Sequence, residues 1–457
     1  MIIRKSSIEI VLLGLTFALI VVWAVPHTIA IRNILLLMCL PLALICLKRY
    51  WLISYRFPIA IFFLLILFVW MVAHYFIFSF SPAIELKELI STGLRSFIGC
   101  LIAIAIAAAI KSKKYSFAWL STAFYIYSFG ILGVYLFQSY SLGAWLSPND
   151  FLGKNHSNDG INKVNPAFMA SIAVAVAYAN ISIIFEKYQE LKTILIKIWP
   201  HVLGIFASFL SVFVVNTKNG VAICMFLTVI FVVVTIFNIL KNFKKNKYLL
   251  FALVFAVIAG GSLWLNHSSK SSPGWRTMLS DVATSVQVNK YLNWQNTPKY
   301  GVPVNGDGQV VASNSYERFS WASKGILLIK DYPMGYGTLT HQSFPALLKL
   351  EGIDIVCFME TCGTHSGWVD FGLAYGVPGI LSLTLAIAFG LFAGLRIRDS
   401  YAVLACWIFL VALFAPLFQE IAMKHLFEIW LFIIAFASGL VANPKASDGN
   451  THQGMTQ

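Results

Sequence analysis

The sequence predicts an all-α polytopic membrane protein with about twelve transmembrane helices and one long, partly helical loop. The first observation is composition: 59% of the 457 residues are hydrophobic and only 11% are charged, whereas about a quarter of a typical soluble domain is charged. The second is that apolar runs recur at the length that crosses a bilayer. The third is one polar interval, residues 267–367, that is too long and too patterned for a linker.

A transmembrane helix needs about 20 predominantly apolar residues, and we divided the chain with that length. No small-residue cleavage site follows the first apolar run, so we interpret it as a helix and not as a removable signal peptide. The predicted spans are 8–25, 29–47, 58–80, 93–110, 116–138, 165–185, 199–216, 220–240, 248–266, 368–395, 400–418 and 425–442. Because their number is even, both termini are expected on the same side of the membrane.

Basic residues orient these helices. With the N-terminus in the cytoplasm, 18 Lys and Arg residues fall in cytoplasmic segments and 7 in the short outer segments, which satisfies the positive-inside rule. The net charge of +14 therefore reflects topology, and no basic helix or aromatic RNA-binding motif indicates a nucleic-acid partner. We expect both termini in the cytoplasm and, for a bacterial inner-membrane protein, residues 267–367 in the periplasm.

The predicted organisation has four parts. Residues 1–266 form transmembrane helices 1–9, 267–367 form the periplasmic loop, 368–442 form helices 10–12, and 443–457 form a disordered cytoplasmic tail.

The long loop itself contains helical segments. Residues 315–330 have helical periodicity and are followed by Pro333, which ends a helix, while 274–292 predict a second amphipathic helix. Residues 296–314 are rich in Asn, Gly, Pro and Ser and are expected to be irregular. Apolar side chains on one face of the first helix are Phe319, Ala322, Ile326 and Ile329.

Cations on the outer side are the first candidates for chemistry. Arg276 and Arg318 lie in the long loop, and Lys218 lies where the span 220–240 meets the outer surface. Lys87 and Arg95 lie near the outer loop between the third and fourth predicted spans. A single cation of this kind is usually solvated, but several that converge suit a diphosphate, which Arg binds through two parallel hydrogen bonds.

Metal and cofactor motifs are missing from the sequence. It contains no GxxxxGK[ST] motif, no HExxH motif and no paired carboxylates at the start of the outer loops, so we expect no metal and no cofactor. Cys357 and Cys362 lie in the outer loop, and the sequence leaves open whether they form a disulfide.

His365 is the strongest candidate for a catalytic residue. It lies at the junction of the long loop and the tenth span, near a helix N-terminus that favours an anionic group. A neutral imidazole can take a proton from a hydroxyl, although a histidine that only bonds the loop is the alternative. Asp370 and Glu360 are candidates to orient it, on proximity in sequence alone.

Three sequence segments together resemble the motifs of the O-antigen ligase family. His365-Ser366, nine residues, and then Gly376-Val377-Pro378-Gly379 resemble its H[NSQ]-x9-G-x-x-[GTY] motif. The stretch from Arg318 to Trp321 and from Lys330 to Gly337 looks like its Arg…Trp…D-x-P-x-G-x-G segment. Thr217-Lys218-Asn219-Gly220 stands where the family has Ser-Arg-x-Gly, with lysine in place of arginine. Lysine keeps the charge but loses the bidentate fork.

The resemblance implies a metal-independent, inverting glycosyltransferase of GT-C-like fold. It would move O-antigen glycan from an undecaprenyl-diphosphate donor to a sugar of the lipid A-core acceptor, at the periplasmic face, among membrane lipids. In this interpretation His365 is the general base, Arg276, Arg318 and Lys218 hold the diphosphate, and Lys87, Arg95, Asp370 and Ser366 support the site.

Two other functions remain open. An O-antigen polymerase or a protein O-oligosaccharyltransferase shares the donor chemistry and differs in the acceptor. A transporter of lipid-linked glycan would show repeated halves and charges at mid-membrane, whereas the sequence shows no such repeat and few charges within the spans.

Overall fold

The structure is a computed structural model of the 457-residue chain. It describes residues 7–51, 57–113, 117–151, 163–241, 255, 259–260, 277–339, 343–356, 363–397 and 399–442. Within these ranges the regular elements are helices, and the sole β-type pairing is an isolated bridge between Val304 and Val310.

The helices follow the apolar runs of the sequence. Those that pack into the main bundle are α1 (Ser7–Trp23), α2 (Ile29–Cys46) with η1 (Leu47–Trp51), α4 (Ile59–Ile77), α5 (Pro82–Glu88), η2 (Leu89–Gly93), α6 (Leu94–Lys113), α7 (Ala118–Ser141), α9 (Val164–Lys187), α10 (Leu191–Val214), α11 (Lys218–Lys241), α17 (Gly367–Ile397), α18 (Ser400–Phe418) and α19 (Lys424–Leu440). Shorter helices between α11 and α17 are α13 (Met278–Ser285), η4 (Leu292–Gln295), α14 (Thr297–Tyr300), α15 (Ser313–Asp331) and α16 (Ser343–Leu350).

Nine helices in the described part of the chain are long and apolar enough to cross a membrane, with α1 as a shorter apolar helix. They confirm a polytopic all-α protein, whereas the count of twelve stays a prediction. The expected span 248–266 lies outside the described residues except for isolated positions. Two helices are longer than predicted: α10 begins at Leu191 and not at 199, and one continuous helix runs over Pro82–Ser112.

The loop helices agree in part with prediction. Helix α15 spans Ser313–Asp331 against the expected 315–330, and α13 covers only Met278–Ser285 of the expected 274–292. The stretch predicted to be irregular contains the four-residue α14, whose Asn296 side chain caps the helix by accepting from Lys299 N.

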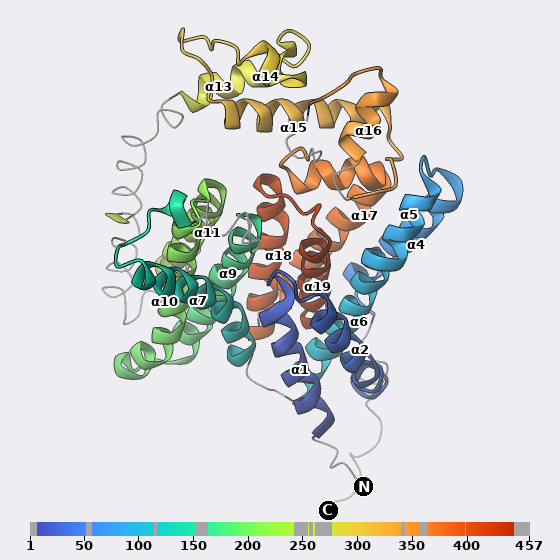
Figure 1. The fold of residues 1–457 in the computed structure, drawn as a ribbon. Coiled ribbons are helices and arrows are strands. Elements are labelled where there is room, and N and C mark those ends of the chain that lie inside the picture. The colour runs from blue at the N-terminus through green and yellow to red at the C-terminus, as the bar shows by residue number, and fades with distance from the viewer. Residues whose placement is uncertain are drawn as a thin grey trace, which may run out of the picture.

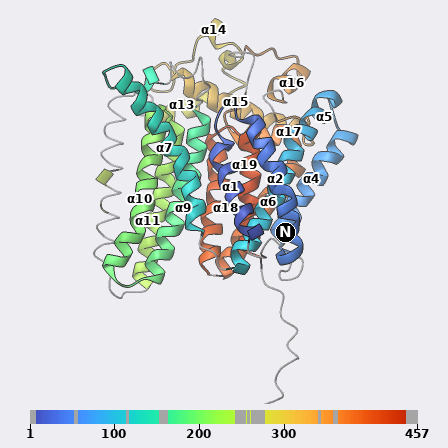
Figure 2. The same ribbon diagram turned by 60° about the horizontal axis from the view of Figure 1, so that its bottom comes forward.

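Helix α15 lies across one end of the bundle, with α13, α14 and α16 beside it (Figures 1 and 2). We call this end the α15 side. Its helices share a small core built around Trp294, Tyr316, Trp321 and Phe344, and Val369 and Leu373 of α17 belong to the same core. We call the helices α13 to α16, with η4, the cap, and this shared core packs the cap onto α17.

Close packing holds the centre of the bundle. Helix α19 packs along α6, and a Cβ on Gly439 would lie 2.6 Å from Ala107 Cβ. Small residues at such contacts let helix backbones approach closely, which is the main source of helix association inside a membrane.

Helix α17 is kinked at Gly376, whose φ of 65° lies in the left-handed region. Pro378 has no N–H to donate back to Ala374, so the kink leaves carbonyls without helical partners. Tyr336 N donates to Leu373 O at 2.8 Å and Gly337 N to Ala374 O at 2.7 Å. The segment after α15 thus replaces the missing helical hydrogen bonds.

Helices α4 and α5 hold the same segment from its other side. Leu339 N donates to Glu88 Oε1 at 2.7 Å, and Glu85 lies against Gly337. Glu85 is itself paired with His74 at 2.7 Å, and both side chains are buried. The segment 333–339 therefore joins α4 and α5 to the N-terminal half of α17, the half that follows His365.

Candidate functional site

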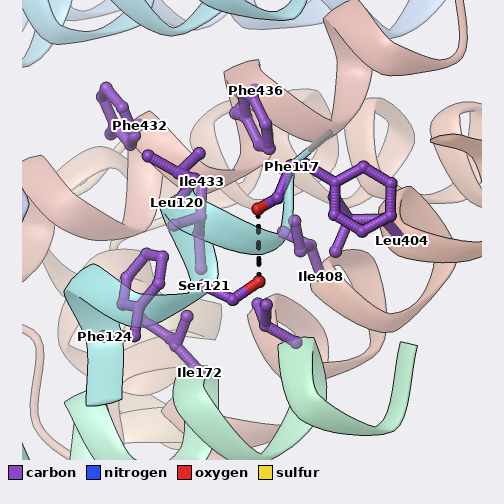
Figure 3. Close-up of a pocket in the computed structure, with 11 residues that line it drawn as sticks. Phe117, Leu120, Ser121, Phe124, Ile172, Leu404, Ile408, Phe432, Ile433 and Phe436 are labelled. Atoms are coloured by element: carbon purple, nitrogen blue, oxygen red, sulfur yellow. Dashed lines mark hydrogen bonds between the residues drawn. The ribbon is translucent and has the colours of Figure 1, made fainter. Parts of the chain in front are cut away.

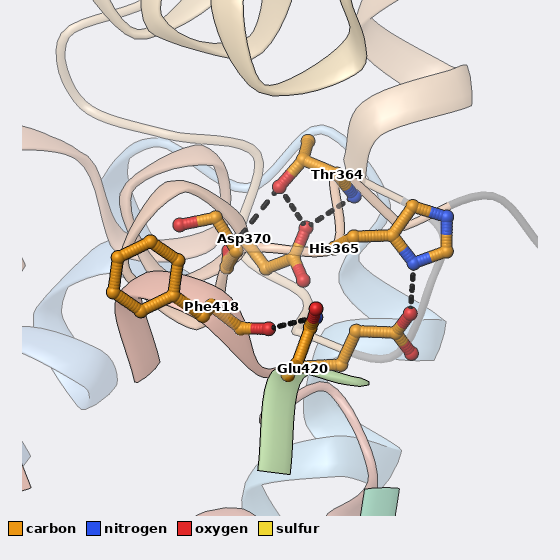
Figure 4. A network of polar contacts seen from close by, with 7 residues as sticks. Thr364, His365, Asp370, Phe418 and Glu420 are labelled. Atoms are coloured by element: carbon orange, nitrogen blue, oxygen red, sulfur yellow. Dashed lines mark hydrogen bonds and ion pairs between the residues drawn. The ribbon is translucent and has the colours of Figure 1, made fainter. Parts of the chain in front are cut away.

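His365 precedes α17 on the α15 side and has a φ of 59°. A non-glycine residue in the left-handed region is uncommon, and such backbone strain is concentrated at functional sites. Its Nδ1 forms a hydrogen bond with Oε1 of Glu420, in the connection between α18 and α19 (Figure 4). An ionised carboxylate accepts only, so Nδ1 donates this hydrogen bond, and in a neutral imidazole the lone pair would then be on Nε2.

Trp321 of α15 fixes the plane of this imidazole. The two rings stack with centroids 5.6 Å apart and 8° between their planes. The indole is anchored in turn, because its Nε1 donates to Trp294 O at 3.1 Å. His365 is thus positioned by a carboxylate on one edge and by an aromatic face, and a quarter of its side chain stays exposed.

Arg318 lies one helical turn before Trp321 and brings a cation to the same place. Burial lowers the pKa of Arg318 from its ordinary value, and the charges of Glu420 and Glu317 oppose that shift. The carboxylate of Glu420 therefore acts on both His365 and Arg318.

Two lysines complete the group of cations. Burial, followed by repulsion from Arg318 and Lys218, lowers the pKa of Lys163, although its side chain still reaches solvent. Lys163 precedes α9 and Lys218 begins α11. Asn219 Nδ2 donates to Phe418 O at 2.6 Å, which ties the start of α11 to the segment that carries Glu420.

Asp370 has a different role from the one its sequence position suggested. It does not bond His365: its Oδ1 accepts from Thr364 N at 2.8 Å and from Thr364 Oγ1 at 2.7 Å. Ser366 O accepts from Asp370 N, so these residues close the turn that leads into α17. Asp370 therefore orders the backbone around His365, and Glu420 orients its ring. Glu360 lies outside the described residues.

The other predicted cations are distributed elsewhere. Arg95 pairs with Glu428 at 2.6 Å, in a separate polar cluster, and Lys87 is exposed on α5. Arg276, Cys357 and Cys362 lie outside the described residues. Across the ranges that are described, no group of three His, Cys, Asp or Glu side chains could hold a metal ion.

Sequence reasoning missed Glu420 and Lys163 as members of this site. Glu420 is separated from His365 by 55 residues, and Lys163 was counted only as one of the outer basic residues. A signal for Glu420 was present: it is a carboxylate directly after an apolar span, where acidic residues are rare.

An apolar cavity lies away from this site, among α7, α9, α18 and α19 (Figure 3). Its volume is about 10 Å³, near the smallest that holds one water molecule. Its one hydroxyl, Ser121 Oγ, already donates to Phe117 O. The cavity is a packing defect with no group suited to bind a polar ligand.

The fold and its apolar helices define an all-α, multi-pass membrane protein with a polar centre at one end. No family model and no curated protein matches the chain.

Proposed function

We propose that the protein is a glycosyltransferase that moves a glycan from a polyprenyl-diphosphate carrier to a hydroxyl acceptor on the α15 side of the membrane. The observation that carries the proposal is the His365–Glu420 pair beside Arg318, Lys218 and Lys163. Arg318, Lys218 and Lys163 come together at this centre, where they could bind an anion, and Glu420 and Glu317 are the carboxylates that act on Arg318.

The reaction would be a single displacement at the anomeric carbon. The acceptor hydroxyl attacks C1 while its proton passes to Nε2 of His365, and the C1–O bond to the diphosphate breaks with its electron pair staying on the leaving oxygen. Arg318, Lys218 and Lys163 would stabilise that charge. Attack opposite the leaving group inverts C1, and the charge that Glu420 offers to Nδ1 stabilises the imidazolium.

The resemblance to O-antigen ligases favours an undecaprenyl-diphosphate-linked O-antigen as donor and lipid A-core as acceptor. The α15 side would then be the periplasmic face of a bacterial inner membrane, with both termini in the cytoplasm. A polymerase or a protein O-oligosaccharyltransferase would use the same residues with a growing glycan or a protein hydroxyl as acceptor.

Reconstituted protein supplied with the lipid-linked donor and each acceptor in turn tests the proposal. We expect transfer to lipid A-core, and a loss of about 10²-fold or more in His365→Ala. His27→Ala is the matched control, since His27 is exposed and also has a positive φ, of 57°. Full transfer by His365→Ala would refute the general base, and carriage of donor across vesicles without any transfer would favour a transporter.

A further inference from the structure

A second charged cluster lies on the α15 side, where α1, α2, α6 and α19 meet. Arg95 Nε donates to Glu428 Oε1 at 2.6 Å, and Trp23 Nε1 donates to Glu428 Oε2 at 3.0 Å. Arg32, in the first turn of α2, lies within electrostatic range of both Glu428 and Arg95. Charged groups inside membrane helices are costly and mark functional positions by default.

Arg32 is incompletely satisfied. Its Nη1 donates to Trp23 O at 3.2 Å, but its Nε is buried and has no hydrogen-bond partner in the part of the chain that the structure describes. Both oxygens of Glu428 are already bonded by Arg95 and Trp23. The guanidinium of Arg32 thus has an N–H donor without an acceptor, and it shares its one negative neighbour, Glu428, with Arg95.

The charges in this cluster do not balance. Two guanidinium groups lie beside a single carboxylate, and Glu428 is the one anion that acts on Arg32 among the described residues. The nearby His425 adds no negative charge, and its Nε2 bonds Asn165 Oδ1 at 2.9 Å. Burying a cation without a full counter-charge is unfavourable, so an external anion would stabilise this arrangement.

The surroundings identify the source of that anion. Ile29, Ile31 and Ile34, which flank Arg32 on α2, have 50–57% of their surface exposed and face outward. Arg32 therefore lies at a helix end bordered by exposed apolar side chains, and in a bilayer that end of α2 would lie near the phosphates of membrane lipids. We propose that Arg32, with Arg95 beside it, binds the phosphate of an anionic membrane lipid on the α15 side.

This site is separate from the centre around His365, and its existence does not depend on the proposed function. Arg318, Lys218 and Lys163 form one group, whereas Arg32 and Arg95 converge on Glu428. Loss of the lipid phosphate should leave binding of a polyprenyl diphosphate at the other centre unchanged.

Native mass spectrometry of the purified full chain, titrated with dioleoyl-phosphatidylglycerol, measures the interaction. Dioleoylglycerol, which has the same tails without phosphate, is the lipid control, and inorganic phosphate is the free-anion control. We expect phosphatidylglycerol to be retained at least about tenfold better than either control. Equal retention of dioleoylglycerol, or displacement of the lipid by millimolar phosphate, would overturn the assignment to a lipid phosphate.

Three variants localise the binding. Arg32→Gln should lower retention about tenfold, and Glu428→Gln should raise it, because the competing carboxylate is removed while the amide can still bond. Lys424→Gln, at an exposed cation on the same end of α19, should change nothing. Unchanged retention in a folded Arg32→Gln would overturn the proposal, as would equal losses of phosphatidylglycerol and polyprenyl diphosphate binding. If Arg32→Gln does not fold, the direction of the Glu428→Gln effect decides.

Discussion

Gly335 and Gly376 lie so close together that neither position has room for a side chain. A Cβ on Gly335 would lie 2.6 Å from Gly376 N, and a Cβ on Gly376 would lie 2.3 Å from Pro333 O. Both residues also have positive φ, 88° and 65°. The two glycine-containing sequence segments are therefore the two halves of one backbone junction, which bends α17 at Gly376, within the helix that follows His365.

The first prediction concerns this junction. Gly376→Ala combines strain at positive φ with a clash against backbone, so we expect a loss of stability of about 2 kcal/mol or more and a large loss of transfer activity. Thermal melting in detergent measures the first effect. Gly352 has a φ of 73° but open space around it, so Gly352→Ala measures the cost of backbone strain without a clash. Gly306 has neither a positive φ nor a close neighbour, so Gly306→Ala should leave the melting temperature unchanged. Equal melting temperatures for Gly376→Ala and Gly306→Ala would contradict the structure.

The second prediction concerns Glu420. Glu420→Gln keeps a hydrogen-bonding group beside His365 Nδ1 but removes the charge that stabilises the imidazolium, and we expect transfer to fall about 10–100-fold with the fold intact. The matched control is Glu351→Gln, which removes a carboxylate paired with Lys324 in the same cap. Activity should be assayed on samples of equal melting temperature. Similar activities for the two variants would remove Glu420 from the site.

The third prediction concerns the pH dependence of anion binding. Since burial and the charges of Arg318 and Lys218 lower the pKa of Lys163 below its ordinary value of 10.5, its charge is present at low pH and is lost as pH rises, earlier than in a free lysine. Affinity for polyprenyl diphosphate should therefore weaken at alkaline pH. Lys163→Arg should hold the affinity constant over that range, because arginine stays protonated. Lys424→Arg, at an exposed lysine, should retain the decline; an identical alkaline decline in Lys163→Arg would exclude Lys163 from binding.

The fourth prediction concerns the aromatic support of His365. Trp321→Leu removes the stacked face and the bond to Trp294 O, and we expect about a tenfold lower rate. Trp321→Phe keeps an aromatic face and should lose less. Trp368→Leu tests whether loss of any buried indole has the same effect, because Trp368 Nε1 bonds Leu413 O and stacks on no imidazole in the described chain. The comparison uses turnover rates at saturating donor.

The sequence by itself determined the helical membrane architecture and the approximate boundaries of most helices, and it singled out His365 and Arg318 as candidates. Apolar runs of spanning length have few alternatives to a helix in a bilayer, because the backbone must satisfy its hydrogen bonds internally. Prediction failed at helix ends such as the start of α10, where Lys192 and Lys197 interrupt the apolar run, so a search for an uninterrupted apolar span placed the start of the helix too late.

Only the tertiary structure decided which groups meet at the site. Glu420 reaches His365 across 55 residues, Asp370 bonds Thr364 instead, and Arg95 pairs with Glu428 across 333 residues. These pairings depend on how α15, α17, α18 and α19 pack and on the kink at Gly376. A local sequence pattern shows which residue types are available for such contacts. It does not show which of them meet, because that depends on packing between segments far apart in the sequence.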